Sequence, residues 1–211
     1  MIEHVIFDFD LTLVDSAEGI CATLNALAAE KNLRSLGLDE VRRTIGLPLA
    51  GALRIFWGDG PVEEEWLPRY RQLFEKYGHE AIAPFPEVPP ALDALRKRGY
   101  KMAVASNRLA PLAIVAATGL EKYFSVIVGT EGLAPKPDPA VVIEAMRQLG
   151  ARPENTAYVG DTDIDMKTAC SACVAGIGAA TGNHDAAALA AAGARRVIHN
   201  LGELPECLEA M

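Results

Sequence analysis

Short apolar runs alternate with helical patterns along most of the chain. Such runs, without the apolar–polar alternation of a half-exposed strand, are typical of parallel strands covered on both faces. They occupy residues 4–9, 101–106, 125–130, 156–161, 173–178 and, with a weaker pattern, 195–199. Helical patterns separate them at residues 89–98, 139–149 and 185–192. This alternation predicts an α/β fold with a doubly wound, Rossmann-like parallel sheet.

Residues 16–80 break the alternation. Apolar residues recur there at helical spacing, and no strong strand pattern is present. A Pro-rich segment, APFPEVPP at residues 83–90, then returns the chain to the strand-and-helix pattern. We therefore expect a helical cap at residues 16–80, inserted into an α/β core made of residues 1–15 and 81–211.

Composition narrows the class of protein. The chain has 211 residues, of which 50% are hydrophobic and 23% are charged, the balance of a globular protein with a buried core. The formal net charge of -8 argues against general nucleic-acid binding. No apolar run approaches the length of a membrane span, and the first residues do not resemble a secretory signal. We expect a cytoplasmic protein without nucleic-acid or membrane partners, and its oligomeric state stays open.

Cysteine usage offers one motif. Cys170 and Cys173 form a C-x-x-C pair, a spacing found in redox motifs, whereas Cys21 and Cys207 are distant in sequence. Neither a disulfide scaffold nor a four-cysteine zinc site is therefore expected. Of the two interpretations of the pair, we favour two small buried thiols at the joint between a helix and a strand.

Acidic residues follow two of the predicted strands. Asp8 and Asp10 come at the end of the first strand, and Asp161, Asp163 and Asp165 come at the end of the fourth. Ligands of open α/β sheets bind outside the carboxyl ends of the strands, so these carboxylates converge if the two strands are neighbours. A set of oxygen ligands without His or Cys suits magnesium and does not suit zinc.

Hydrogen-bond donors follow the other two strands. Ser106 and Asn107 end the second strand, and Lys136 lies after the third, where Asp138 can cap the next helix. Each feature alone has an ordinary explanation as a capped loop, a turn or a helix start. Four such features at the ends of four successive strands point to a site for phosphoryl transfer, where charge neutralisation does most of the catalysis.

The four segments in this order resemble the motifs of the haloacid dehalogenase-like hydrolase superfamily. Within it they are similar to the phosphoglycolate phosphatase-like branch with a helical cap. The motifs are DFDLTLVDS at 8–16, VASN at 104–107, KPDP at 136–139 and GDTDID at 160–165. The resemblance covers essentially the whole chain. It implies a magnesium-dependent phosphatase that hydrolyses a small phosphorylated metabolite, with phosphoglycolate as the first candidate.

The resemblance also implies roles for the acidic residues. Asp8 would be the nucleophile that forms an aspartyl-phosphate, and Asp10 would protonate the leaving alcohol and then activate water. Asp8, Asp161 and the backbone carbonyl of Asp10 would hold Mg²⁺. Asp165 would complete the acidic cluster, through water or by holding the motif lysine. The presence of Asp10 separates this chain from the dehalogenase members, because a leaving halide needs no proton.

The phosphoryl oxygens would be bound by Ser106, Asn107 and Lys136. Two positions depart from the family pattern. Leu11 stands in the tight turn after the nucleophile, where many relatives have Gly, so the loop geometry there is in question. Arg108 stands where Lys is frequent, which keeps the charge and changes the geometry of its donors.

The predicted cap supplies candidates for substrate specificity. Arg42, Arg43 and Arg54 could meet a second anionic group of the substrate, although arginines on helices are usually solvated. Two other functions stay open at this point. One is phosphoryl transfer between sugar positions, as in phosphoglucomutase-like relatives with the same motifs. The other is a non-catalytic binding protein, which would be expected to lose one of the motif residues.

Overall fold

The computed structural model describes residues 1–79 and 81–211 with their side chains, and residue 80 by its backbone. In this described part of the chain, no helix is long and apolar enough to cross a bilayer. The chain divides into two compact units.

The two units are an α/β unit and a helical unit. The α/β unit consists of Met1–Val14 and Pro84–Met211, and the helical unit consists of Asp15–Ala83. The chain passes from one to the other through two short strands that pair with each other, β2 (Val14–Asp15) and β3 (Ala83–Pro84).

A six-stranded sheet forms the centre of the α/β unit, in the order β5-β4-β1-β6-β7-β8. All its pairings are parallel, and Ile6 of β1 lies opposite Ala103 on one side and Tyr158 on the other. The strands are β1 (His4–Phe7), β4 (Lys101–Ala105), β5 (Val126–Val128), β6 (Thr156–Gly160), β7 (Ala175–Ala179) and β8 (Arg196–Ile198). This sheet confirms the predicted fold class, including the strand with the weakest pattern.

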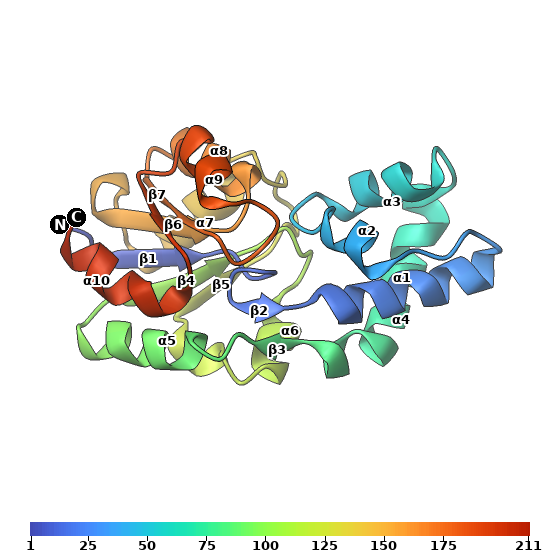
Figure 1. The fold of residues 1–211 in the computed structure, drawn as a ribbon, viewed down its shortest axis with the longest axis horizontal. Helices are drawn as coiled ribbons and strands as arrows, with labels where there is room; N and C mark the ends of the chain where they lie inside the picture. The colour runs from blue at the N-terminus through green and yellow to red at the C-terminus, as the bar shows by residue number, and fades with distance from the viewer. The chain divides into compact units, whose positions relative to one another are not determined.

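Helices cover both faces of the sheet, with α7, α8 and α9 on one face and α5 and α10 on the other (Figure 1). Side chains alternate along β1, so Ile6 packs with Val142 and Ala145 of α7, and its neighbours in the strand face the other way. The helices are α5 (Val88–Lys97), α6 (Leu112–Ala117), α7 (Ala140–Leu149), α8 (Asp163–Ser171), α9 (Ala186–Ala191) and α10 (Leu204–Glu209). Three 3-10 turns complete the unit: η3 (Glu121–Tyr123), η4 (Pro153–Asn155) and η5 (Leu201–Glu203).

The start of α7 differs by one residue from the prediction. Asp138 was predicted as the N-cap, but the helix begins at Ala140 and the capping position belongs to Pro139. The Asp138 carboxylate still accepts a hydrogen bond from the Ala140 backbone N–H at 2.9 Å, so it satisfies one of the free donors of the first turn.

The helical unit packs around α1, which contacts α2 and α4. Leu24 and Leu27 of α1 are buried, as are Phe56, Trp66 and Leu73 from the other elements. Its elements are α1 (Ala17–Lys31), α2 (Leu38–Arg42), α3 (Leu49–Trp57), the π-helical turn η1 (Val62–Trp66), α4 (Leu67–Tyr77) and η2 (His79–Ala81).

The turn after β1 has the backbone conformation that favours glycine. Leu11 is fully buried and has φ +57°, in the left-handed region. Its carbonyl accepts a hydrogen bond from the Thr181 hydroxyl at 2.7 Å, and its N–H donates to the Val14 carbonyl at 2.8 Å. A buried side chain and two hydrogen bonds hold this strained turn, which is why a leucine is tolerated where glycine would be easier.

Candidate active site

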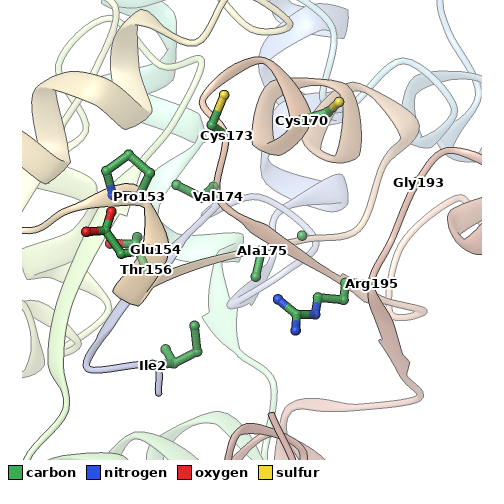
Figure 2. A pocket seen from close by; sticks show the side chains of 11 residues that line it. Ile2, Pro153, Glu154, Thr156, Cys170, Cys173, Val174, Ala175, Gly193 and Arg195 are labelled. Carbon is green, nitrogen blue, oxygen red and sulfur yellow. The ribbon is translucent and has the colours of Figure 1, made fainter.

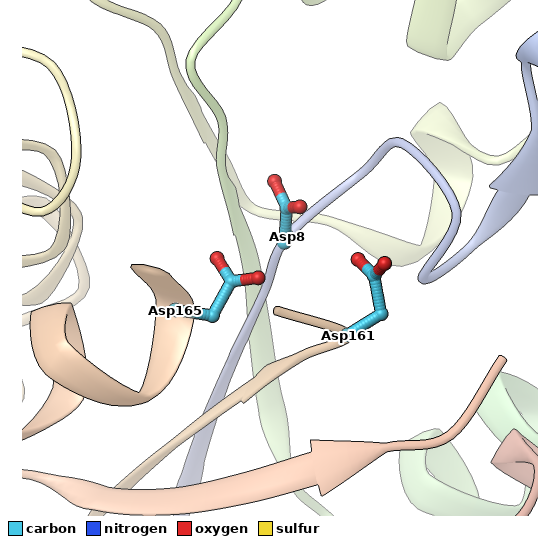
Figure 3. A group of neighbouring side chains, drawn as sticks. All are labelled: Asp8, Asp161 and Asp165. Atoms are coloured by element: carbon cyan, nitrogen blue, oxygen red, sulfur yellow. The ribbon is translucent and has the colours of Figure 1, made fainter. Parts of the chain in front are cut away.

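Three carboxylates meet at the carboxyl ends of β1 and β6. Asp8 follows β1, Asp161 follows β6, and Asp165 lies in the first turn of α8. Their oxygens lie within 4.8 Å of one another, and all three side chains are buried. Figure 3 shows Asp8 between Asp165 and Asp161. The two strands are neighbours in the sheet, as the predicted convergence of these carboxylates requires.

The start of α8 holds Asp165 in place. The Thr162 hydroxyl accepts a hydrogen bond from the Asp165 backbone N–H at 3.2 Å, and Asp165 Oδ2 accepts one from the Thr162 N–H at 3.0 Å. This reciprocal capping box satisfies two free donors of the helix. The interpretation of GDTDID as a helix start is therefore confirmed, and the role of Asp161 and Asp165 as metal ligands stays a prediction.

Lys136 lies among these carboxylates and is itself buried. Its Nζ is 2.7 Å from Asp8 Oδ1, 2.7 Å from Asp165 Oδ1 and 3.0 Å from the Tyr158 hydroxyl. The ammonium group has three donors, so each has a partner. Burial opposes its charged form, but the carboxylates of Asp165 and Asp8 outweigh burial and raise the pKa of Lys136 well above its usual range.

The carboxylates carry more negative charge than Lys136 offsets. Burial raises the pKa of Asp8 to about 7, since the lost hydration and the repulsion from Asp165 outweigh the attraction of Lys136. Burial, with repulsion from Asp165 and Asp8, also raises the pKa of Asp161 well above its usual range. A bound cation would remove this repulsion and favour the ionised form of each group.

Asp161 has an oxygen suited to a cation. Its Oδ1 accepts a hydrogen bond from the Thr12 hydroxyl at 3.0 Å, whereas its buried Oδ2 has no hydrogen-bond partner among the described residues. A Cβ at Gly182 would lie 1.8 Å from Oδ2, so only a residue without a side chain fits there. Buried oxygen ligands with one unpartnered carboxylate oxygen fit a hard divalent cation.

Asp10 does not share the cluster through its side chain. Its carboxylate is paired with Arg108, with Arg108 Nε 2.8 Å from Oδ2 and Arg108 Nη2 2.7 Å from Oδ1. The guanidinium also lies over the Phe9 ring, 5.8 Å from its centroid. The structure thus separates Asp8, at the acidic cluster, from Asp10, in a two-pronged ion pair beside it.

The predicted phosphate-binding residues lie in two loops that are tied together. Asn107 Oδ1 accepts a hydrogen bond from the Lys136 N–H at 2.7 Å, and its Nδ2 lies 3.5 Å from the Lys136 carbonyl oxygen. Ser106 is buried, and its hydroxyl accepts a hydrogen bond from the Arg108 N–H at 3.2 Å. The Asn107 side chain therefore positions the lysine-bearing loop, and phosphate binding by Ser106, Asn107 and Lys136 stays a prediction.

The three candidate arginines lie in the helical unit. Arg42 is 3.4 Å from Asp15, Arg54 is 2.5 Å from Glu63, and Arg43 is exposed. Their predicted role in substrate specificity stays a prediction.

Sequence reasoning missed three residues of the site. Tyr158 looked like an ordinary member of an apolar strand, although a buried tyrosine usually requires a partner for its hydroxyl. The hydroxyl lies 3.1 Å from both the Ala105 carbonyl oxygen and Asp165 Oδ1. Thr12 lies within the first motif and could have been found there. Nothing in the sequence marks Gly182, because its contact with Asp161 joins segments distant in the chain.

The C-x-x-C pair lies at the opposite, amino-terminal edge of the sheet, on the rim of a pocket of about 360 Å³ (Figure 2). Both thiols are exposed, so the prediction of buried thiols is wrong. Cys170 is on the outer side of the last turn of α8, and Cys173 has φ +57° in the turn that leads to β7. The location between a helix and a strand was predicted correctly, but neither side chain enters the core.

Fold and site together define a class of protein. A doubly wound parallel sheet carries, at the carboxyl ends of its central strands, a buried lysine and buried carboxylates whose oxygens lie close enough together to hold a metal ion. This is the arrangement of an α/β enzyme that acts on an anionic substrate.

Comparison with known proteins identifies the family. The model of the haloacid dehalogenase-like hydrolases matches residues 5–179. A phosphoglycolate phosphatase of Aquifex aeolicus is 37% identical over 171 residues, 77% of this chain and 78% of that protein. A phosphoglycolate phosphatase of Rhodobacter capsulatus is 34% identical over 82% of this chain and 81% of its own. The chain belongs to the haloacid dehalogenase-like hydrolase family, as the motifs predicted.

Solved structures agree with this assignment. One named as a haloacid dehalogenase-like hydrolase from Bacteroides fragilis has a TM-score of 0.87 and 29% identity, and covers 97% of this chain and 100% of its own. Another, named as a β-phosphoglucomutase from Thermotoga maritima, has a TM-score of 0.77 and 25% identity, and covers 100% of both chains. The fold is therefore shared by relatives named for hydrolysis and for phosphoryl transfer.

Proposed function

We propose that this protein is a magnesium-dependent phosphatase that hydrolyses a small phosphorylated metabolite through an aspartyl-phosphate on Asp8. The observation that carries the proposal is the contact of the buried Asp8 with Lys136, next to the unpartnered oxygen of Asp161. Phosphoglycolate is the first candidate substrate, because several relatives are named as phosphoglycolate phosphatases.

In the first step, a carboxylate oxygen of Asp8 attacks the phosphorus atom and the bond from phosphorus to the ester oxygen breaks. Lys136, 2.7 Å from Asp8, offsets the charge of the phosphoryl group as it approaches the carboxylate. Asp8, Asp161 and the backbone carbonyl of Asp10 would hold Mg²⁺, with Asp165 completing the set. When bound, the ion would neutralise negative charge on the phosphoryl oxygens.

Asp10 acts as the general acid and then as the general base of the reaction. It gives a proton to the ester oxygen as the alcohol leaves, and the resulting carboxylate then takes a proton from water. The hydroxide attacks the phosphorus of the aspartyl-phosphate, which releases inorganic phosphate and restores the Asp8 carboxylate. Ser106, Asn107 and Lys136 bind the phosphoryl oxygens in both steps, and the arginines of the helical unit are candidates to contact the rest of the substrate.

The test measures phosphate release from 4-nitrophenyl phosphate with Mg²⁺, with EDTA, and in the Asp8→Asn variant. We expect EDTA to abolish turnover and Asp8→Asn to lower kcat by at least about a thousandfold. Asp138→Asn is the matched control, because this exposed carboxylate lies in the lysine motif outside the acidic cluster. Activity that survives EDTA or Asp8→Asn would contradict the proposal.

Phosphoryl transfer between sugar positions is the second candidate, supported by the likeness to the structure named as a β-phosphoglucomutase. A panel of phosphorylated metabolites distinguishes hydrolysis from this transfer. Each metabolite is assayed both for release of inorganic phosphate and for formation of an isomerised sugar phosphate. A cytoplasmic location and the identity of the ion as Mg²⁺ belong to the same proposal.

A further inference from the structure

We propose that Arg108 determines substrate specificity by binding a carboxylate that the substrate carries next to its ester oxygen. Without substrate, the same guanidinium holds Asp10. This inference rests on the proposed phosphatase function and names the substrate class: phosphate monoesters of small 2-hydroxy acids.

The ion pair between Arg108 and Asp10 has the geometry of carboxylate recognition. Both oxygens of Asp10 accept from Arg108, at 2.8 Å and 2.7 Å, in the parallel arrangement by which a guanidinium recognises a planar carboxylate. A carboxylate that accepts both hydrogen bonds of a guanidinium is held in its ionised form, so Asp10 has no proton to donate to the ester oxygen in this arrangement. Binding of a productive substrate must therefore release at least one of these hydrogen bonds.

The guanidinium that Asp10 releases lies in a shielded position. The Arg108 side chain retains only 17% of its exposure and lies against the Phe9 ring, so water cannot fully replace its lost partner. Removal of one partner from a shielded ion pair is strongly unfavourable unless another anion takes its place. A substrate carboxylate offers the same pair of oxygens in one plane, whereas a neutral alkyl group offers none.

Arg108 also lies close to the place where the proposed reaction occurs. The Arg108 backbone N–H donates to the Ser106 hydroxyl, so this arginine belongs to the predicted phosphate-binding loop. Asp10 has to contact the ester oxygen when it protonates the leaving alcohol. A guanidinium that contacts Asp10 therefore lies near the substituent on that oxygen, and a carboxylate one carbon away is within its reach.

The experiment compares two substrates that differ in the carboxylate, 2-phosphoglycolate and ethyl phosphate, each with Mg²⁺. We expect Arg108→Met to lower kcat/KM for 2-phosphoglycolate on the order of 30-fold, mainly through KM, and for ethyl phosphate by less than about threefold. Arg108→Lys keeps the positive charge but not the two parallel N–H donors. It should give an intermediate loss of kcat/KM, and only for 2-phosphoglycolate. Because both substrates are measured on one preparation, a partly unfolded fraction cancels from the ratio.

Arg147→Met is the matched control. Arg147 binds Glu144 through the same two nitrogens, at 2.8 Å and 2.7 Å, on the exposed side of α7. It should leave both substrates unchanged. An equal loss on both substrates in Arg108→Met would overturn the inference, because it would mean that Arg108 only positions Asp10. If the unmodified protein hydrolysed no phosphate ester in the presence of Mg²⁺, the proposed function itself would be overturned instead.

Discussion

The two units differ in whether they bury an ion pair. The helical unit carries its ion pairs at the surface, as between Arg69 and Glu30, where both partners retain 40% side-chain exposure. The α/β unit buries Lys136 between Asp8 and Asp165 with almost no exposure. Surface pairs add little to stability, whereas a buried charge is costly and tends to be kept for chemistry.

The comparison predicts its largest effect for Lys136→Met. Loss of the ammonium leaves Asp8 and Asp165 facing each other without a counter-charge, which should lower the free energy of unfolding by about 3–5 kcal/mol without metal. Urea denaturation monitored by circular dichroism measures this change. Added Mg²⁺ should stabilise the variant more than the unmodified protein. If Lys136→Met were as stable as the unmodified protein, the buried ion pairs of the α/β unit would contribute no more to stability than the surface pairs of the helical unit.

The next largest effect is expected for Tyr158→Phe. This change removes the hydroxyl that accepts from Lys136 at 3.0 Å, leaving one buried donor without a partner at a cost of about 1–3 kcal/mol. Urea denaturation measures the loss, and kcat should fall because the ammonium is less well positioned. Tyr123→Phe, at another buried tyrosine of the α/β unit, is the matched control. If both variants were equally stable, Tyr158 would have no role in holding Lys136.

Metal binding by the buried carboxylates of the α/β unit should depend on pH. The pKa of Asp8 is about 7 without metal, so below pH 7 a proton must leave before the carboxylate can bind a cation. Apparent affinity for Mg²⁺ should therefore fall as pH falls, by about tenfold between pH 8 and pH 6 from this group alone. Isothermal titration calorimetry with Mg²⁺ at several pH values measures it. Constant affinity across this range would contradict the raised pKa.

The smallest effect is expected for Arg69→Gln in the helical unit. Arg69 binds Glu30 through two nitrogens, both at 2.6 Å, but solvent and salt screen this pair. We expect no measurable shift in Tm and no change in phosphatase activity. A loss comparable with that of Lys136→Met would remove the distinction between the two units.

Much of this architecture could be predicted because it depends on local pattern. Continuous apolar runs predicted the parallel sheet, and strand ends predicted that Asp8, Asp161 and Lys136 would gather at one edge. The helix α8 was considered only as an alternative, since its sequence DIDMKTACS is mostly polar and its start doubles as the ligand motif.

What could not be predicted depends on contacts between distant residues. Arg108 and Asp10 are 98 positions apart, and no spacing rule shows that they form a two-pronged pair. Gly182 fits against Asp161 only because the segment after β7 returns to the end of β6. The sequence located Cys170 and Cys173 at a helix-to-strand joint. The outward direction of Cys170 depends on how α8 rotates against the sheet, and that of Cys173 depends on the left-handed turn after the helix.

The Asp165 side chain has two structural roles in the first turn of α8. One carboxylate oxygen caps the helix through the Thr162 N–H, and the other binds Lys136. The same side chain therefore supports both the start of the helix and the position of Lys136, which also contacts Asp8. Fraying of the first turn of α8 would therefore displace one of the two carboxylates that contact Lys136, which couples the order of this helix end to the position of the lysine.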